Sequence, residues 1–230
     1  MRSEKEPENL AILPVLRTKE DARRFYDRIS RAYDLITRLF ERKYAEIALN
    51  HLSVQEGEIV LEIGFGSGYC LKLIAESVGP TGKAYGVDIS MGMLEVTKKR
   101  LEKSALMPRV HLYCGDATSL PYDDTTFDAV FMSFTLELFD TPEIPIILEE
   151  IKRVLKPKGR LAVASMSKEN GQSILLRLYE WLHKKWPRYV DCRPIYLERS
   201  LKDAGYEVIG KERVKLFSLP GEIAVALKSS

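Results

Sequence analysis

The sequence predicts an α/β fold in which helices cover both faces of a doubly wound, mostly parallel sheet. Short apolar runs alternate, between residues 58 and 166, with segments whose apolar residues recur every three or four positions. One run, Phe127 to Met132, is almost continuously apolar, as in strands buried on both faces. The first run leads directly into a glycine cluster that opens a helix. Such alternation favours a parallel sheet.

Two helices are expected before the first strand. Residues 1–17 have the composition of a polar tail. Thr18, with Asp21 three positions later, is typical of a helix N-cap with an acid in the first turn. Residues 18–54 are therefore predicted to be helical. Their apolar residues at helical spacing are Phe25, Ile29, Tyr33, Ile36 and Phe40, followed by Ile47, Ala48 and Leu52.

Five strands are expected within a core of residues 55–170. They are Glu58 to Ile63, Lys83 to Asp88, Val110 to Cys114, Phe127 to Met132 and Arg160 to Met166. The helix after the first strand stops at Gly79-Pro80, and Ser90 can cap the next helix. A further helix ends before Pro157-Lys158-Gly159.

The alternation stops after the fifth strand. Residues 171–205 predict two helices, an aromatic and basic one over 171–190 and a second around Leu201. Residues 206–230 then contain two apolar runs that predict a hairpin at the edge of the sheet. Residues 18–230 are expected to form a single domain.

Composition excludes several classes of protein. The chain has 230 residues, is 45% hydrophobic, and carries 35 basic and 33 acidic side chains, so its net charge is only +2. This balance argues against a nucleic-acid partner. Cys70, Cys114 and Cys192 have neither a disulfide nor a zinc spacing, so no metal is expected. No apolar run reaches the roughly 20 residues of a membrane span, and the charged N-terminus does not resemble a signal peptide. We expect a cytoplasmic protein.

The glycine cluster after the first strand indicates a nucleotide-like ligand, because glycines let the backbone approach it and the helix start offers N–H donors. The cluster has glycines at relative positions one, three and five, namely Gly64, Gly66 and Gly68. The dinucleotide fingerprint requires the third glycine at position six, where this chain has Tyr69. The spacing therefore disfavours NAD.

Three acids follow three successive strands. Glu62 ends the first strand, Asp88 ends the second, 20 residues after Gly68, and Asp116 lies just beyond the third. They suit, in turn, a cationic amino group, two ribose hydroxyls and an adenine amino group. S-Adenosylmethionine has all three groups and no phosphate.

These motifs resemble those of the class I S-adenosylmethionine-dependent methyltransferases. The resemblance covers residues 55–165 and is carried by Val60 to Gly68, Gly86 to Ser90, Gly115-Asp116-Ala117, Leu120-Pro121-Tyr122, Phe127 to Val130 and Arg153 to Pro157. It implies a Rossmann-like sheet of seven strands, six parallel and one antiparallel. It also implies S-adenosylmethionine as cofactor and S-adenosylhomocysteine as product.

Within this class the chain is most similar to the ubiquinone/menaquinone-biosynthesis type. Phe25-Tyr26-Asp27 and Ala32-Tyr33-Asp34 fit that group, in which an N-terminal helix closes over the cofactor as a lid. Those enzymes usually have Arg-Asn after the fourth strand, where this chain has Ser133 to Glu137. Pro157-Lys158-Gly159 and Pro220 to Ile223 also differ from their pattern. The sequence thus leaves the methylated atom (carbon, oxygen, nitrogen or sulfur) open.

The resemblance and the spacing together define the expected cofactor site. Its residues are Tyr26, Tyr33, Glu62, Gly64, Phe65, Gly66, Ser67, Gly68, Asp88, Ile89, Met93, Gly115, Asp116, Ala117, Ser133 and Phe134. Methyl transfer is an in-line displacement that depends mainly on alignment, so no catalytic residue is firmly expected. Glu137 is the candidate for an acceptor contact or base, and a helix-start carboxylate is an equally weighted interpretation.

The expected acceptor is a small lipophilic or aromatic molecule. Residues 174–189 contain both tryptophans, Trp181 and Trp186, together with basic residues. This segment can roof an apolar acceptor pocket, rest on a membrane interface, or simply pack on the sheet.

Other functions stay open at this stage. They are a phospholipid or small-amine N-methyltransferase, an NAD-dependent oxidoreductase and a non-catalytic cofactor-binding protein. A nucleic-acid methyltransferase is disfavoured because the Asn/Asp-Pro-Pro-aromatic motif is missing after Met132. The sequence does not indicate an oligomeric state.

Overall fold

The computed structural model describes residues 12–15, 17–37, 41–169, 174–185, 192–216 and 219–229. Two helices, α1 (Lys19–Thr37) and α2 (Arg42–Leu52), precede the first strand. The predicted N-cap of α1 is confirmed, because the backbone N–H of Asp21 donates to Thr18 Oγ1 at 3.1 Å.

The core alternates strands and helices as predicted. Its elements are β1 (Ile59–Ile63), α3 (Tyr69–Ser77), β2 (Lys83–Asp88), α4 (Met91–Lys103), β3 (Val110–Cys114), β4 (Phe127–Ser133), α5 (Glu143–Val154) and β5 (Leu155–Met166), with short 3-10 turns η1 (Met107–Arg109) and η2 (Leu136–Leu138). Ser90 caps α4, since its Oγ accepts the backbone N–H of Met93 at 3.1 Å.

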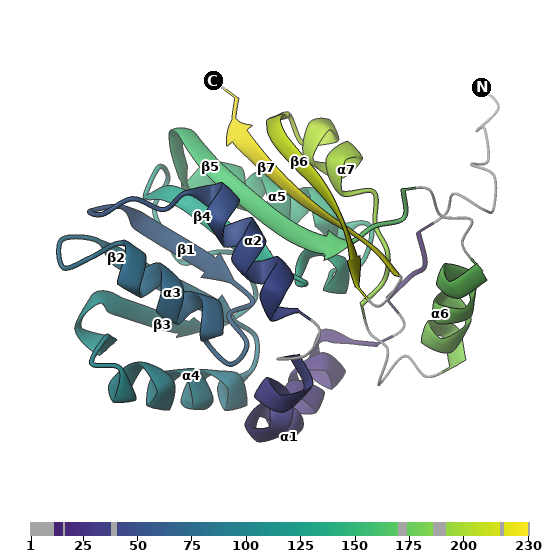
Figure 1. The fold of residues 1–230 in the computed structure, drawn as a ribbon, viewed down its shortest axis with the longest axis horizontal. Helices are drawn as coiled ribbons and strands as arrows, with labels where there is room; N and C mark the ends of the chain where they lie inside the picture. The colour runs from purple at the N-terminus through teal and green to yellow at the C-terminus, as the bar shows by residue number, and fades with distance from the viewer. Residues whose placement is uncertain are drawn as a thin grey trace.

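The strands form one seven-stranded sheet in the order β3-β2-β1-β4-β5-β7-β6 (Figure 1). The last two strands are β6 (Tyr206–Leu216) and β7 (Leu219–Lys228). Among the described strands β7 alone runs opposite to the others, because it pairs antiparallel with both β5 and β6. The expected mixed sheet is confirmed.

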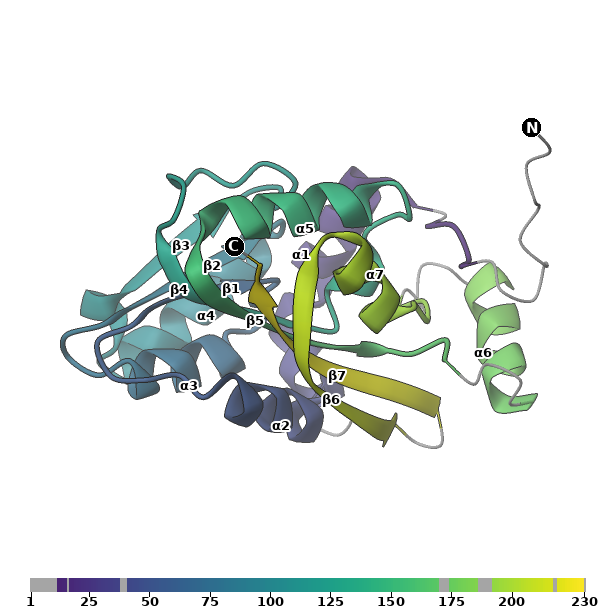
Figure 2. The ribbon, with the colours of Figure 1, turned by 90° about the horizontal axis from the view of Figure 1, so that it is seen from above.

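Helices cover both faces of this sheet, as Figure 2 shows. Alternate β1 side chains separate two cores, with Val60 packing toward α2, α3 and α4 and Leu61 toward α5 and α7 (Leu197–Asp203). Each core is built of aliphatic and aromatic side chains, so burial of this apolar surface holds both layers in place. The doubly wound arrangement leaves the carboxyl ends of the strands free for a site.

The start of β5 differs from the prediction. The strand begins at Leu155 rather than Arg160, and its pairing with β4 shifts register between Phe127 and Ala129. Lys158 has a positive φ of 61°, so Pro157-Lys158-Gly159 forms an irregularity within the strand instead of a separate turn.

The helix expected over 171–190 is α6 (Ile174–Lys185). Residues 186–190, including Trp186, lie outside the described residues. In both views α6 lies at the end of the molecule, away from the helices that cover the sheet (Figures 1 and 2). Leu176 is nonetheless fully buried and α6 contacts β7, so packing against the sheet stays an open interpretation for this segment.

Candidate active site

A cavity of about 400 Å³ opens at the carboxyl ends of β1, β2, β3 and β4. The residues expected at the cofactor that line it are Tyr26, Tyr33, Gly64, Gly66, Asp88, Ile89, Met93, Gly115, Asp116, Ala117, Ser133 and Phe134. The lining residues that the sequence did not assign to the cofactor site are Val15, Arg17, Thr18, Lys19, Ala22, Ile63, Val87, Thr135, Leu138, Phe139, Asp140, Pro142 and Glu143. Most of the predicted residues thus lie on the strand-end half of the cavity, and most of the opposite wall comes from residues without a local sequence signal.

The glycine loop after β1 has the backbone that only glycine adopts easily. Gly66 has a φ of +50°, and a Cβ there would lie 3.2 Å from Cε1 of Tyr33. Its N–H donates to Asp88 Oδ2 at 2.9 Å. The loop is therefore fixed between β2 and α1 in a form that allows a ligand to approach its backbone.

Asp88, at the end of β2, is a buried carboxylate held by two backbone donors. Gly66 N and Ser90 N each donate to it at 2.9 Å. Burial raises the pKa of Asp88 to about 6, although these backbone bonds oppose the shift, and the nearby charge of Asp27 adds to it. Each carboxylate oxygen can still accept a second bond, so hydroxyl donors of a ligand can be bound here.

Glu62, at the end of β1, is buried behind the glycine loop and does not line the cavity. Within the described residues its Oε2 has no hydrogen-bond partner. Burial raises the pKa of Glu62 well above its usual value, and the charge of Asp88 raises it further. A buried carboxylate in this state is costly for the fold unless a cation compensates it. This acid therefore suits the ammonium of S-adenosylmethionine, and the glycine loop in front of it suits close approach of that group.

Asp116 is engaged by a residue that the sequence did not indicate. Lys19 Nζ, at the start of α1, lies 2.6 Å from Asp116 Oδ2 and 2.5 Å from Glu143 Oε1. Burial raises the pKa of Asp116, but the bonds from Lys19 and Thr118 outweigh it and hold that pKa below its usual value. No short-range pattern could reveal this pair, because Lys19 and Asp116 are 97 positions apart.

A second contact holds α1 against the body of the protein. Asp27 Oδ1 accepts Ser90 Oγ at 2.7 Å and Gly92 N at 2.8 Å, at the start of α4. Tyr26 and Tyr33 then lie on the cavity side of α1. The N-terminal helix therefore forms one wall of the site.

Four residues expected at the cofactor lie outside the cavity lining. Glu62, Phe65, Ser67 and Gly68 are behind the loop or within it. Gly68 is nevertheless required, because it has a φ of +75° and a Cβ there would collide with the side chain of Thr97. These residues shape the loop rather than the cavity surface.

Glu137 is also outside the cavity lining. It is fully buried in η2, and its Oε1 accepts the N–H of Met166 at 3.1 Å. Thr135 and Leu138 form the cavity wall at this point. Glu137 thus ties η2 to the end of β5, and we assign it no catalytic role.

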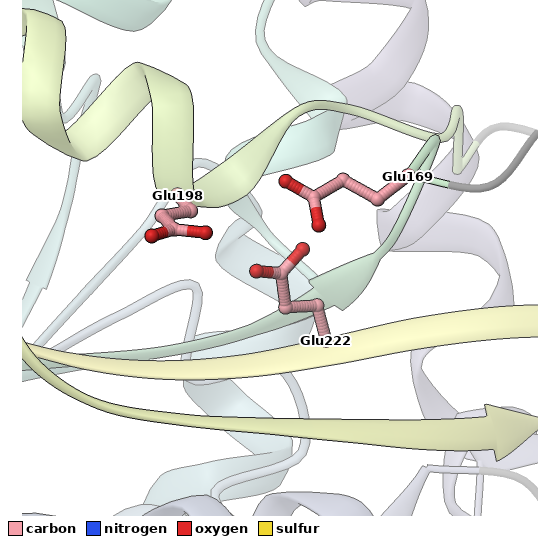
Figure 3. Close-up of side chains that lie close together, drawn as sticks. All are labelled: Glu169, Glu198 and Glu222. Atoms are coloured by element: carbon pink, nitrogen blue, oxygen red, sulfur yellow. The ribbon is translucent and has the colours of Figure 1, made fainter.

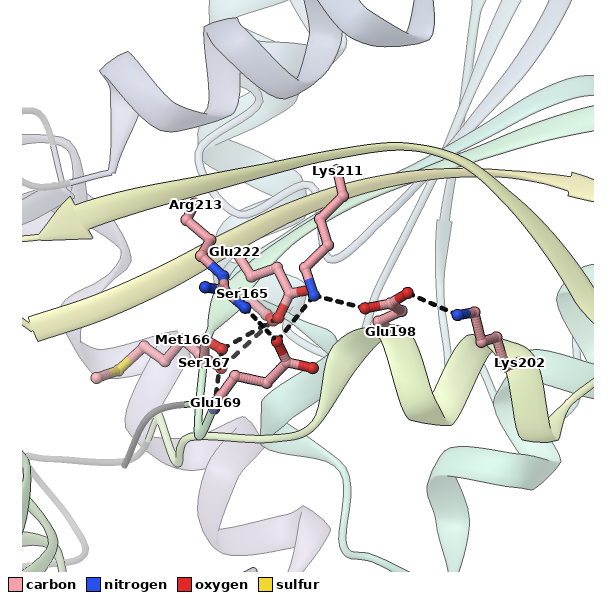
Figure 4. Close-up of polar contacts among 9 residues, drawn as sticks. All are labelled: Ser165, Met166, Ser167, Glu169, Glu198, Lys202, Lys211, Arg213 and Glu222. Carbon is pink, nitrogen blue, oxygen red and sulfur yellow. Dashed lines mark hydrogen bonds and ion pairs between the residues drawn. The ribbon is translucent and has the colours of Figure 1, made fainter. Parts of the chain in front are cut away.

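A second group of carboxylates lies beside β7, outside the cofactor cavity. Glu169, Glu198 and Glu222 point toward one another (Figure 3), close enough to suggest a cation site. Lys211 already supplies that cation, with its Nζ at 2.8, 2.5 and 3.0 Å from the three carboxylates in that order (Figure 4). The group is a structural ion-pair network that joins β6, β7, α7 and the chain after β5.

A glycine loop after β1, an acid at the end of β2 and a crevice above a sheet with β7 antiparallel together define a class I S-adenosylmethionine-dependent methyltransferase. A family model described as a methyltransferase domain matches residues 60–159. A demethylmenaquinone methyltransferase of Symbiobacterium thermophilum is 35% identical over 196 residues, covering 78% of this chain and 76% of that protein. One of Staphylococcus aureus is 30% identical over 225 residues, covering 92% and 88%. The chain belongs to the family of these demethylmenaquinone methyltransferases.

Solved structures agree with this assignment. An S-adenosylmethionine-dependent methyltransferase from Aquifex aeolicus is 26% identical, with a TM-score of 0.65 over 88% of this chain and 98% of that one. The cyclase SpnF has a TM-score of 0.76 over 94% and 98% but is 19% identical, so it shows the fold alone. The protein is a methyltransferase that uses S-adenosylmethionine and acts on a small molecule. An oxidoreductase and a non-catalytic protein are not favoured.

Proposed function

We propose that the chain methylates the ring of a reduced, prenylated naphthoquinone, as the names of its relatives suggest. The observation that carries this proposal is the extent of the similarity. The Staphylococcus aureus relative matches over 225 residues, far beyond the cofactor core of residues 60–159. The match therefore extends into the N-terminal and C-terminal segments that we expect to face the acceptor. The cavity wall contributed by Tyr26, Tyr33, Phe134, Leu138 and Phe139 is apolar and aromatic, which suits a flat ring.

The cofactor would be held by the three acids in the order expected from the strands. Asp88 would accept the ribose hydroxyls, Asp116 would face the adenine, and Glu62 would supply the negative charge behind the ammonium. When bound, S-adenosylmethionine supplies a methyl group on a sulfonium whose positive charge disappears on transfer. The chain's own contribution is alignment and exclusion of water by the wall that α1 forms.

A methyl-transfer assay with an acceptor panel tests this function. We expect label from S-adenosylmethionine to enter a reduced demethylated naphthoquinone with a prenyl tail, and not phosphatidylethanolamine or a small amine. Asp88→Ala should abolish transfer, whereas Asp128→Ala should keep it. Asp128 is the matched control because it lies on β4 and bonds Ile59 N and Lys156, away from the cavity. Label in the lipid amine would favour the N-methyltransferase alternative and overturn the proposal.

A lipophilic acceptor raises the question of how it reaches the site. Among the described helices none is long and apolar enough to cross a bilayer. We propose instead that α6 rests on the surface of the membrane, on its cytoplasmic side. Leu178 and Trp181 are each 51% exposed, and Lys185 Nζ lies 4.9 Å from the centre of the Trp181 ring. An exposed tryptophan beside a lysine is typical of a membrane interface.

Vesicle sedimentation tests this contact. Trp181→Ala should weaken binding to neutral phosphatidylcholine vesicles, because it removes the ring that enters the interface. Ile209→Ala is the control, since Ile209 is equally exposed, at 53%, but lies on β6. Equal binding by both variants would exclude α6 as the contact.

A further inference from the structure

A second hollow, distinct from the cofactor cavity, lies where α1, α3 and α4 meet. This groove has a volume of about 950 Å³. Its cationic side chains are Arg42, Lys72, Lys99, Arg100 and Lys103, which come from three helices. Its acidic lining residues are Asp27 and Glu95. We call it the basic groove.

The positive charge of the basic groove is only partly compensated. Lys72 pairs with Glu76 at 2.5 Å. Asp27 accepts from Ser90 and Gly92, so its carboxylate is directed to the start of α4. Lys99 and Lys103 lie one turn apart on α4, and the structure gives neither a carboxylate partner within the described residues. Because the whole chain has a net charge of only +2, this local excess marks a site for an anion.

Part of the groove is held in place before any ligand arrives. The guanidinium of Arg42 lies 4.2 Å from the centre of the Tyr69 ring, on which it stacks. A stacked arginine and exposed lysines suit phosphate oxygens, which accept several donors at once.

We propose that the basic groove binds the phosphates of anionic lipid headgroups. This contact would orient the protein with α1 facing the bilayer. The preference for lipid over a soluble anion rests on the proposed lipophilic acceptor. Met91, 46% exposed, adjoins the groove through its neighbour Gly92 and offers an apolar side chain to the bilayer.

The position of α1 gives this contact a consequence for the site. Asp27 and Ser30 line the basic groove, whereas Tyr26 and Tyr33 line the cofactor cavity. The same helix therefore separates headgroups from the reaction site. Occupation of the groove would bring the lipid phase, in which the acceptor dissolves, next to the wall that α1 forms at the cavity.

Sedimentation with vesicles of different charge tests the proposal. The test pair is Lys99→Gln with Lys103→Gln, and the control pair is Lys83→Gln with Lys158→Gln. Lys83 and Lys158 are exposed near the amino ends of β2 and β5 and do not line the basic groove, so the two pairs remove equal charge from different parts of the surface. On vesicles containing phosphatidylglycerol the test pair should lower the partition coefficient about tenfold or more, and the control pair should change it far less. High salt should abolish the difference.

Several outcomes would overturn the proposal. An equal loss of vesicle binding in the test pair and the control pair would mean that binding depends only on the net charge of the protein. Full competition by inorganic phosphate would identify a soluble anion as the ligand, and binding to RNA without binding to vesicles would identify a nucleic acid. S-Adenosylhomocysteine titration of each variant shows that the fold is intact. Because no step requires turnover, failure of methyl transfer with quinols would leave this test unaffected.

Discussion

At the scale of single residues, Glu62 is the side chain whose environment the fold alone does not explain. Its carboxylate is buried, and its Oε2 lacks a hydrogen-bond partner within the described residues. Glu62→Gln should therefore raise the free energy of unfolding by about 1 to 3 kcal/mol at pH 7. The same change should weaken S-adenosylhomocysteine binding, because the ammonium loses its opposite charge.

The sign of the pH dependence follows from the raised pKa of Glu62. Its folded value lies above the unfolded value near 4.5, so the folded state holds the proton more tightly. Ionisation therefore costs stability increasingly as the pH rises above 4.5. Urea unfolding at pH 4 and pH 7 should show that Glu62→Gln stabilises more at pH 7. Equal effects at both pH values would contradict this reading.

Asp88 should make cofactor affinity depend on pH. Its pKa is raised to about 6, and the ionised form is the better acceptor for ribose hydroxyls. Calorimetric titration with S-adenosylhomocysteine should show affinity falling about tenfold between pH 7 and pH 5, as the carboxylate is protonated. Asp88→Asn should bind weakly and lose most of this dependence. A flat profile for the unsubstituted protein would exclude Asp88 as a ribose ligand.

At the scale of elements, α1 is attached to the cavity by few polar contacts. Asp27→Ala removes the acceptor of Ser90 Oγ and Gly92 N, each of which then loses a buried partner. The dissociation rate of S-adenosylhomocysteine, followed by stopped flow, should rise about tenfold. Asp21→Ala is the control, because Asp21 belongs to the N-terminal cap of α1 and not to its contact with α4. Equal effects of both changes would mean that helicity, rather than docking, governs release.

Features that depend on a short sequence pattern could be predicted from the sequence. Features that depend on contacts between residues far apart in the chain could not. The strands, the glycine loop and the acids at 62 and 88 follow from apolar runs and short spacings. The start of β5 at Leu155 depends on its pairing with Phe127, which no window of sequence contains. The contact of Lys19 with Asp116 depends on how α1 packs against α4 beside the cavity. The burial of Glu137 could not be predicted either, because its position after β4 gives no sign that the side chain is fully buried.

At the scale of the whole molecule, the hairpin of β6 and β7 closes the sheet and is fastened by Lys211. Hydrogen bonds to Glu169, Glu198 and Glu222 raise the pKa of Lys211 although burial lowers it. Lys211→Met would leave three carboxylates without this cation, so the free energy of unfolding should fall by about 1 to 3 kcal/mol. Thermal melts should show this loss, while affinity for S-adenosylhomocysteine stays the same.

The same network predicts indifference to divalent metals. The ammonium group of Lys211 already lies among the three carboxylates. Added calcium or a chelator should therefore not shift the melting temperature of the unsubstituted protein. A calcium-dependent rise would show instead that an ion displaces the lysine.

As a cofactor site, the crevice above β1, β2 and β3 must accept a phosphate-free nucleoside with an ammonium group. Calorimetric titration of the same protein preparation with S-adenosylhomocysteine and with NADH tests this most directly. We predict saturable, one-to-one binding of S-adenosylhomocysteine and no measurable binding of NADH. Tighter binding of NADH would contradict the assignment of the site.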